Sequence, residues 1–187
     1  MTANTKLIPS GSQTVGPYFR IGLQYLIDRE AALLPPTDTI ELRGKVIDCD
    51  HAPVPDALLE FWCAGAPLSS AKSEPENGIP AGFHRVATND SGDYRVTLAR
   101  PAPVPFAGST MQAPHFLVLF FARGLLRHLV TRVYFAKHPS NDADPVLLQV
   151  PPERRHTLIA GVDRGNGRIF HWNVVLQGQD ETAFFAW

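Results

Sequence analysis

The sequence is poor in cysteine, which excludes the small protein classes that depend on cross-links. Only two cysteines, Cys49 and Cys63, occur in 187 residues. Two cysteines are too few for a disulfide framework, and these two lack the clustered spacing of a zinc site. The sequence therefore predicts two buried free thiols in a reduced, cytoplasmic protein.

An excess of one charge and a long apolar run are also absent. The 17 Lys and Arg residues nearly balance 18 Asp and Glu residues, which gives a formal net charge of −1. This balance excludes a nucleic-acid partner that binds mainly by electrostatic attraction. The longest apolar run, residues 116–122, is far shorter than the roughly 20 residues of a transmembrane helix, and the first ten residues show no secretion signal. We therefore expect no membrane partner.

Turn-forming residues are abundant, with 17 prolines and 14 glycines in a chain that is 44% hydrophobic. This composition is typical of short elements joined by many turns. Between the turns, alternating or continuous apolar runs predict about nine strands and at most short helices. The runs lie at residues 40–48, 58–63, 85–88, 93–98, 116–122, 130–135, 146–150, 157–162 and 168–176. The predicted fold class is all-β, an antiparallel β-sandwich or barrel in a single domain.

Four local patterns add detail to this prediction. The Asn-Asp-Ser-Gly sequence at 89–92 predicts a hairpin turn, and the apolar run 116–122 predicts a strand buried on both faces. The prolines at the start of 151–155 predict one short helix. The glycine-rich segment 161–167 lies between strands with no helix after it, so it predicts a hairpin loop and not a phosphate-binding loop.

Residues 1–36 differ from the remainder of the chain, and we expect an N-terminal arm there, followed by one β-sandwich domain over residues 37–187. The arm contains the turn residues and two aromatics of 11–19, has weakly helical apolar spacing over 23–34, and ends at two prolines. Such an arm packs on its own domain or on a partner, and the sequence leaves both alternatives open. Residues 69–82 predict a long polar loop.

The residues alone do not assign a catalytic site. The seven histidines show neither the His-x-His nor the helical i, i+4 spacing that is usual for metal ligands. No nucleophile elbow of the Gly-x-Ser-x-Gly type occurs, so a serine hydrolase is not indicated. From the residues alone, the prediction stops at a β-sandwich without an assigned function.

Four stretches of the chain, taken together, resemble the intradiol ring-cleavage dioxygenases. They are residues 13–19 (Gln-Thr-Val-Gly-Pro-Tyr-Phe), 44–62, 88–94 and 113–135. Each stretch is weak evidence singly, but their order and spacing are specific over nearly the whole chain. The last stretch, with the closing residues 174–185, resembles the alpha subunit of a two-subunit member of this family.

The resemblance implies a β-sandwich and a mononuclear non-heme Fe(III) site that two tyrosine phenolates and two histidines hold. His115 matches the first histidine of the family's His-x-His pattern, but Leu117 stands where the second is expected. Phe106 replaces a tyrosine in the Val-Pro-Phe turn at 104–106, and no tyrosine occurs between Cys63 and Arg85. We therefore predict no catalytic and no metal-binding residue in this chain. The Fe(III) would be ligated by an iron-bearing beta subunit of related fold, and the substrates would be a carboxylated catechol and O2.

The same resemblance implies that the alpha subunit lines the partner's substrate pocket. Carried over by position, the substrate-binding residues are Thr14, Gly16 and Tyr18 of the arm and Arg132 of a strand. A guanidinium fork and nearby hydroxyl groups are well suited to binding a carboxylate. From the residues alone, Arg132 is equally compatible with an ordinary ion-paired strand position, and Tyr18 with an interface anchor.

Two other functions remain open at this level. One is a self-sufficient intradiol dioxygenase with ligands outside the family pattern. The other is a β-sandwich binding module without catalytic association, whose apolar surface residues serve some other contact.

Overall fold

The computed structural model describes residues 10–23, 39–63 and 82–186. In this part of the chain, the predicted arm contributes one helical turn, α1 (Tyr18–Ile21). The predicted helical spacing over 23–34, the 36/37 domain boundary and nearly all of the predicted loop 69–82 lie outside the described residues. The division into an arm and one domain therefore stays a prediction.

The described residues form eleven strands, and nine of them make one sheet. Along the sheet the strands run β11-β1-β10-β9-β8-β7-β2-β3, and β4 pairs with β1. The remaining two strands form a small hairpin. The strands are β1 (Thr39–Ile47), β2 (Leu58–Trp62), β3 (Phe83–Ala87), β4 (Asp93–Ala99), β5 (Val104–Pro105), β6 (Met111–Gln112), β7 (His115–Phe121), β8 (Leu129–Phe135), β9 (Ile159–Val162), β10 (Ile169–His171) and β11 (Val174–Val175).

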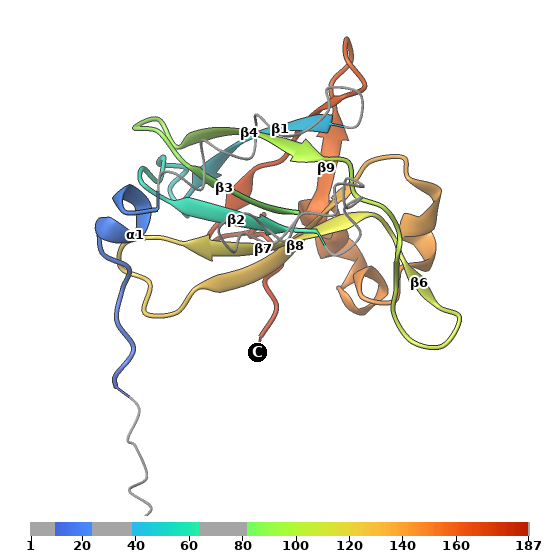
Figure 1. Ribbon diagram of the computed structural model, residues 1–187, viewed down its shortest axis with the longest axis horizontal. Helices are drawn as coiled ribbons and strands as arrows, with labels where there is room; N and C mark the ends of the chain where they lie inside the picture. Colours follow the sequence, from blue (N-terminus) through green and yellow to red (C-terminus); the bar gives the residue numbers. More distant parts are fainter. Residues whose placement is uncertain (1–9, 24–38, 64–81, 187) are drawn as a thin grey trace, which may run out of the picture.

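The strand path folds back on itself, so that β1 and β4 form a layer over β3, β2, β7 and β8 (Figure 1). The all-β, sandwich-like prediction is confirmed. The sheet is mixed and not antiparallel throughout, because β1 pairs in parallel with β10 and β11, and β8 pairs in parallel with β9. Parallel neighbours require long crossover connections, which local sequence patterns do not reveal.

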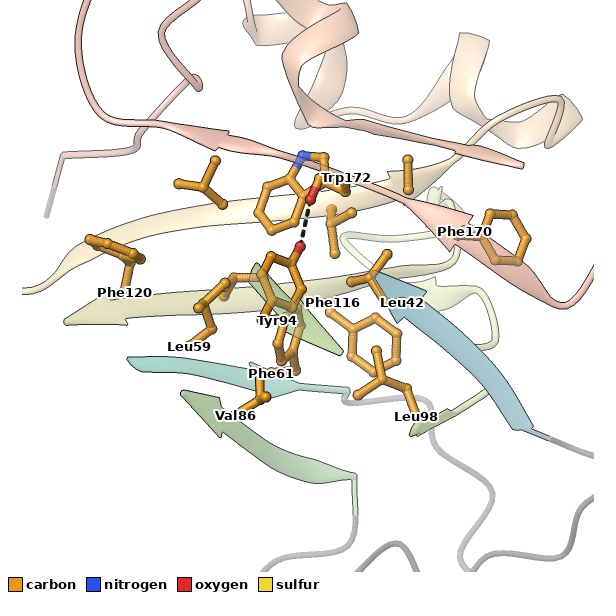
Figure 2. Close-up of a cluster of buried hydrophobic side chains, with 14 of the residues drawn as sticks. Leu42, Leu59, Phe61, Val86, Tyr94, Leu98, Phe116, Phe120, Phe170 and Trp172 are labelled. Atoms are coloured by element: carbon orange, nitrogen blue, oxygen red, sulfur yellow. Dashed lines mark hydrogen bonds between the residues drawn. The ribbon is translucent and has the colours of Figure 1, made fainter. Parts of the chain in front are cut away.

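The core lies between these layers (Figure 2). Every second residue of a strand points into this core. In β7 these residues are Phe116, Val118 and Phe120, and none of them has exposed surface. Within it, the Tyr94 hydroxyl donates a 2.6 Å hydrogen bond to the carbonyl of Trp172. This bond links β4 to the segment between β10 and β11 and satisfies the one polar atom of the tyrosine side chain.

The strand at 116–122 is buried on one face only, contrary to the prediction. On its other face, Leu117, Leu119 and Phe121 are only partly buried. A continuous apolar run does not distinguish a strand covered on both faces from one whose second face is half open.

The turn at 89–92 forms as predicted, but it does not join a hairpin. Asn89 accepts hydrogen bonds from Ser91 and Asp93 through its side chain, and from Gly92 through its carbonyl. However, β3 pairs with β2 and β4 pairs with β1, so this turn connects the two layers. The predicted turn is confirmed, and the predicted hairpin pairing is wrong.

Three of the predicted strands in the C-terminal third change, and one of them, 168–176, is divided into β10 and β11. Residues 146–150 are a 3-10 turn, η3 (Leu147–Gln149), and not a strand. The predicted helix at 151–155 is confirmed as part of a 3-10 helix, η4 (Pro152–Leu158), which takes the first residues of the predicted strand 157–162. A further 3-10 helix, η2 (Pro139–Ala143), follows β8.

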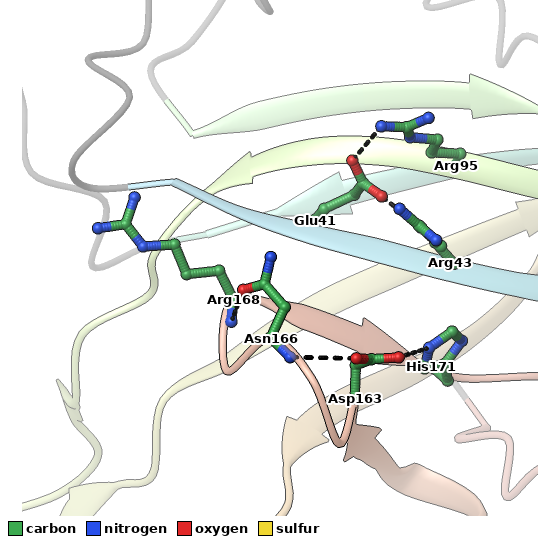
Figure 3. Close-up of polar contacts among 7 residues, drawn as sticks. All are labelled: Glu41, Arg43, Arg95, Asp163, Asn166, Arg168 and His171. Carbon is green, nitrogen blue, oxygen red and sulfur yellow. Dashed lines mark hydrogen bonds and ion pairs between the residues drawn. The ribbon is translucent and has the colours of Figure 1, made fainter.

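The loop predicted over 161–167 forms between antiparallel strands β9 and β10, although its first two residues are the end of β9 (Figure 3). Asp163 accepts backbone hydrogen bonds from Gly165 and Asn166 at 2.8 and 3.1 Å. These bonds lower the pKa of the Asp163 carboxyl, with a further contribution from His171.

On the surface of β1 and β4, Glu41 forms ion pairs with Arg43 and Arg95 (Figure 3). Partial burial alone would raise the pKa of Glu41, but the two arginines together hold it below its usual value.

Neither cysteine forms a disulfide, and Cys63 is buried as predicted. Cys49 is exposed in the turn after β1, so the prediction of two buried thiols is wrong for this residue. The described residues hold no helix with the length and apolar composition that a membrane span requires.

Candidate functional site

The first candidate site surrounds Arg132 on β8. Arg132 lies opposite Leu117 of β7, and Tyr134 lies opposite His115, so these four side chains occupy one face of the strand pair. Nη1 of Arg132 donates to Oε1 of Gln112 at 2.7 Å and to the hydroxyl of Tyr134 at 3.3 Å. The side chain is therefore not an isolated strand residue, because two neutral groups hold its guanidinium in place.

A buried carboxylate supports this arrangement from behind. Asp144 has no exposed surface and accepts backbone hydrogen bonds from Ala113, Val146 and Leu147 at 2.7, 2.9 and 2.7 Å. The Tyr134 hydroxyl donates a fourth bond to it at 3.1 Å. Burial raises the pKa of Tyr134, although Arg132 opposes this shift. The phenol is thus held protonated, with its hydrogen directed to Asp144.

His115 stacks on the ring of Tyr134, with 5.4 Å between the ring centroids. Its Nδ1–H donates to the carbonyl of Ala113 at 2.7 Å, since a carbonyl can only accept. Burial, and then the charge of Arg132, lowers the pKa of His115, although the bond to Ala113 works against them. The imidazole is therefore neutral at pH 7, with its free lone pair on Nε2.

The residues around His115 do not fit the ferric site that the resemblance implies. Leu117 offers no donor atom, and Phe106 is a half-exposed phenyl ring in the β5–β6 turn. Tyr134 is a protonated phenol between Asp144 and a guanidinium, whereas an Fe(III) ligand would be a phenolate. A fixed cation beside a single histidine repels a metal ion and does not assist its binding.

Another group of potential ligands in the described part of the chain is residues 48–50, in the turn after β1. This group is largely exposed, and Asp48 already accepts hydrogen bonds from the backbone of Asp50 and Ala52. The hydrogen bonds of the turn therefore explain why these three residues lie close together.

The second candidate site is the arm. The hydroxyl of Thr14 accepts a 2.9 Å hydrogen bond from the backbone N–H of Gly124, in the turn between β7 and β8. The Gly16 carbonyl accepts the first hydrogen bond of the α1 turn, from Phe19, at 3.0 Å. Tyr18 is 80% exposed and Gly16 has open space around its Cα. Thr14 thus attaches the arm to the turn between β7 and β8, and the ring of Tyr18 is exposed to solvent.

Phe19 anchors the arm on the outer face of the sheet. Its ring lies 4.9 Å from the ring of Phe121 and 4.4 Å from Cζ of Arg85. The Arg85 side chain has no exposed surface and pairs with Glu60 at 3.2 Å. Burial lowers the pKa of Arg85 and raises that of Glu60, and the charge of each group opposes the shift of the other. Phe19 therefore packs over a desolvated cation, a contact that is stronger than at an exposed site.

The structure does not bring the arm and Arg132 together. Phe19 contacts Phe121, whereas Arg132 pairs with Leu117, four residues or about 13 Å away along β7. Figure 1 shows α1 at one end of the sheet and β6, which carries the Arg132 partner Gln112, at the other. The four residues predicted to bind substrate are therefore two separate groups in one copy of the chain.

An apolar groove of about 590 Å³ lies beside the arm. Gln13 and Val15 of the arm, the β7–β8 turn and Phe185 near the C-terminus line it. Arg127 and His128 contribute its polar part.

The residues that support each candidate site carry no signal in the sequence. Gln112, Tyr134 and Asp144 meet Arg132 through contacts between separate elements, and Phe19 meets Arg85 across 66 positions of sequence. No motif spacing indicates such contacts. The Asp-Pro pair at 144–145 does indicate a turn, but not which hydroxyl its carboxylate accepts.

The chain is similar to known proteins over nearly its whole length. A family model described as "Dioxygenase" matches residues 23–178. The protocatechuate 3,4-dioxygenase alpha chain of Burkholderia cepacia is 39% identical over 197 residues, which cover 97% of this chain and 98% of the relative. The alpha chain of the Pseudomonas putida enzyme is 35% identical, with 96% and 98% covered. The beta chain of the Burkholderia cepacia enzyme is 26% identical, with 79% of this chain and 68% of the relative covered.

Two dioxygenases serve as examples of solved structures with the same fold. 3-Chlorocatechol 1,2-dioxygenase from Rhodococcus opacus has a TM-score of 0.57 at 20% identity, with 90% of this chain and 67% of that chain covered. The dioxygenase domain of a Streptomyces carbohydrate-binding fusion has a TM-score of 0.56 at 22% identity, with 81% and 86% covered. At these identities the likeness concerns the fold alone.

Proposed function

The chain belongs to the intradiol ring-cleavage dioxygenase family, and from this premise we propose that it is the alpha subunit of a protocatechuate 3,4-dioxygenase. The observation that carries the proposal is the 39% identity to an alpha chain over 97% of this chain, against 26% to a beta chain over 79% of it. The assembly of this chain with a beta subunit converts protocatechuate and O2 to 3-carboxy-cis,cis-muconate. Both oxygen atoms of O2 enter the product as the bond between the two hydroxyl-bearing carbons breaks.

The iron of the assembled enzyme belongs, in this proposal, to the beta subunit. The support is the chemistry around His115: one neutral imidazole, a protonated phenol and a guanidinium, in place of two histidines and two phenolates. A cytoplasmic location is part of the same proposal, supported by the absence of a disulfide between the two cysteines.

This chain contributes to substrate binding in two places. Arg132 binds the carboxylate of protocatechuate, because a guanidinium gains most from a carboxylate partner. Thr14, Gly16 and Tyr18 present the arm to the mouth of the beta subunit's pocket. Since about 13 Å of strand separates the two groups, one substrate molecule does not contact both groups of one copy, and each contribution is tested by itself.

Metal analysis tests the assignment of the iron. We expect this chain, expressed alone, to be colourless and free of iron. Co-expressed with the beta subunit, we expect a red complex with iron bound, because phenolate-to-Fe(III) charge transfer absorbs visible light, and ring cleavage of protocatechuate. The measurement is iron content per chain, the visible spectrum and oxygen uptake on the same samples.

Either of two results would contradict this assignment. Iron and colour in the lone chain would make it a dioxygenase with ligands of its own. A co-expressed sample without iron and without activity would instead favour a β-sandwich binding module.

Replacement of Tyr18 tests the role of the arm. Tyr18 is 80% exposed, so Tyr18→Ala leaves the chain's own unfolding temperature unchanged. We expect its dissociation constant for the beta subunit to rise about tenfold or more, since an exposed tyrosine that becomes buried on binding contributes strongly to an interface. Titration of the two purified chains measures this constant.

The matched control is Tyr18→Phe, which keeps the exposed ring and removes only the hydroxyl. Its dissociation constant should stay close to that of the wild type. Unchanged association of Tyr18→Ala would remove the arm from the proposal.

A further inference from the structure

We propose that Gln112 and Tyr134 are positioning residues that orient the Arg132 guanidinium for one ligand class, an aromatic carboxylate. The inference rests on the proposed function and deepens it, because it states how this chain makes Arg132 selective for the substituent that distinguishes protocatechuate from catechol.

The hydrogen bonds of Arg132 within this chain occupy one corner of its guanidinium. The hydrogen bonds of Arg132 to Gln112 and to Tyr134 both come from Nη1. Among the described residues, no group accepts a hydrogen bond from Nε or Nη2. These two nitrogens form an edge with two parallel N–H groups, which matches the two oxygens of a carboxylate. The protein thus fixes one corner of the fork and leaves the bidentate edge for a ligand.

The Tyr134 hydroxyl is held in one orientation. Its hydrogen points to Asp144, which three backbone N–H groups hold in a fixed place. The oxygen lone pair therefore faces Nη1 of Arg132 at 3.3 Å. Since Tyr134 and Asp144 have no exposed surface, this support does not exchange with water.

The groups that hold Arg132 leave its positive charge available to a ligand. Gln112 and Tyr134 are neutral, so they hold the guanidinium without cancelling its positive charge. The buried carboxylate of Asp144 contacts the guanidinium only through the phenol. His115, on the same face, has a pKa that burial and then Arg132 lower, and adds no positive charge that would compete for the ligand. A ligand carboxylate is then the counter-ion of Arg132.

The experiment uses the assembled enzyme with the alpha-chain variants Gln112→Ala, Gln112→Glu, Tyr134→Phe and Arg132→Ala. We expect Gln112→Ala and Tyr134→Phe to raise the KM for protocatechuate about fivefold, with kcat and iron content within twofold of the wild type. Gln112→Glu keeps the acceptor oxygen but adds a negative charge, so its KM should rise more than that of Gln112→Ala. The control is Gln149→Ala, which removes an exposed glutamine that donates to the Pro145 carbonyl at 2.9 Å, and it should change nothing.

A second readout separates positioning from a purely structural role. The inhibition constant of 4-hydroxybenzoate, which carries the carboxylate, should rise in parallel with KM, whereas that of phenol, which lacks it, should not change. Equal rises for both inhibitors would overturn the inference, because a distorted pocket weakens both. If Tyr134→Phe fails to assemble, the two Gln112 variants still decide the outcome.

The reference variant separates failure of the inference from failure of the proposed function. If Arg132→Ala raises KM but the Gln112 and Tyr134 variants do not, the positioning role is overturned and the role of Arg132 stands. If Arg132→Ala leaves KM unchanged, the carboxylate-binding role of Arg132 is overturned together with this inference.

Discussion

Replacement of Gly44 by alanine should destabilise this chain strongly, because the added methyl group has no room. Gly44 lies in β1 opposite Tyr94, and a Cβ at this position would meet the Trp172 carbonyl oxygen at 1.7 Å and the Tyr94 hydroxyl at 2.7 Å. Both contacts lie far inside van der Waals distance, and one of them is backbone. The strand must therefore move away from Trp172, which breaks the 2.6 Å hydrogen bond between Tyr94 and Trp172.

The expected loss combines two effects. Overpacking of the core and a buried hydroxyl left without its acceptor together cost about 4 kcal/mol. For a chain of this length, that loss lowers the unfolding temperature by about 10 °C. Differential scanning calorimetry of the co-expressed complex, with the yield of soluble alpha chain, measures it.

Gly161→Ala is the matched control. Gly161 is also a strand glycine, in β9, but its Cβ would meet only the His171 carbonyl, at 3.9 Å. Its unfolding temperature should stay close to that of the wild type. A Gly44→Ala chain that unfolds at the wild-type temperature would contradict this prediction, because it would show that the Trp172 carbonyl can move aside at little cost.

The sequence predicts those parts of the fold that depend on local pattern. Alternation over 40–48 and 93–98 predicts β1 and β4, and the Asn89 turn chemistry predicts the turn between β3 and β4. Local pattern does not encode which strands pair, and so the same turn pattern predicts a hairpin although the turn connects two layers. The parallel pairs of β1 with β10 and β11 join residues more than 120 positions apart, and no pattern at either end specifies them.

For the candidate site, the sequence identifies residues but not how they lie relative to one another. Position within the family pattern identifies Arg132, Thr14, Gly16 and Tyr18, and it identifies Leu117 as the residue that replaces a ligand. It cannot show that Arg132 lies directly opposite Leu117, which is a matter of strand register. The register gives this substitution a physical meaning, since a fixed positive charge now stands beside the position where a histidine would help to hold a metal ion. The separation of the arm from Arg132 follows from the contact of Phe19 with Phe121, which the sequence pattern does not contain.

Arg132→Ala should raise the KM for protocatechuate strongly. In the proposed site, the guanidinium presents Nε and Nη2 to the ligand, and Nη1 donates hydrogen bonds to Gln112 and Tyr134. Loss of a charge-assisted bidentate contact costs about 2 to 3 kcal/mol, or a factor of roughly 30 to 150 in binding. We expect this factor in the KM for protocatechuate, with kcat and iron content unchanged, because the lost contact binds the carboxylate in the ground state and the transition state alike.

Arg132→Lys decides whether charge alone is sufficient. A lysine keeps the positive charge but loses the planar fork, so its KM should lie between that of the wild type and that of Arg132→Ala. Steady-state oxygen uptake over a range of protocatechuate concentrations gives KM and kcat for all three enzymes, and iron is measured on the same preparations. Lost iron with an unchanged KM would place Arg132 in the assembly contact with the beta subunit. The carboxylate of the substrate would then have to bind to a cation that this chain does not supply.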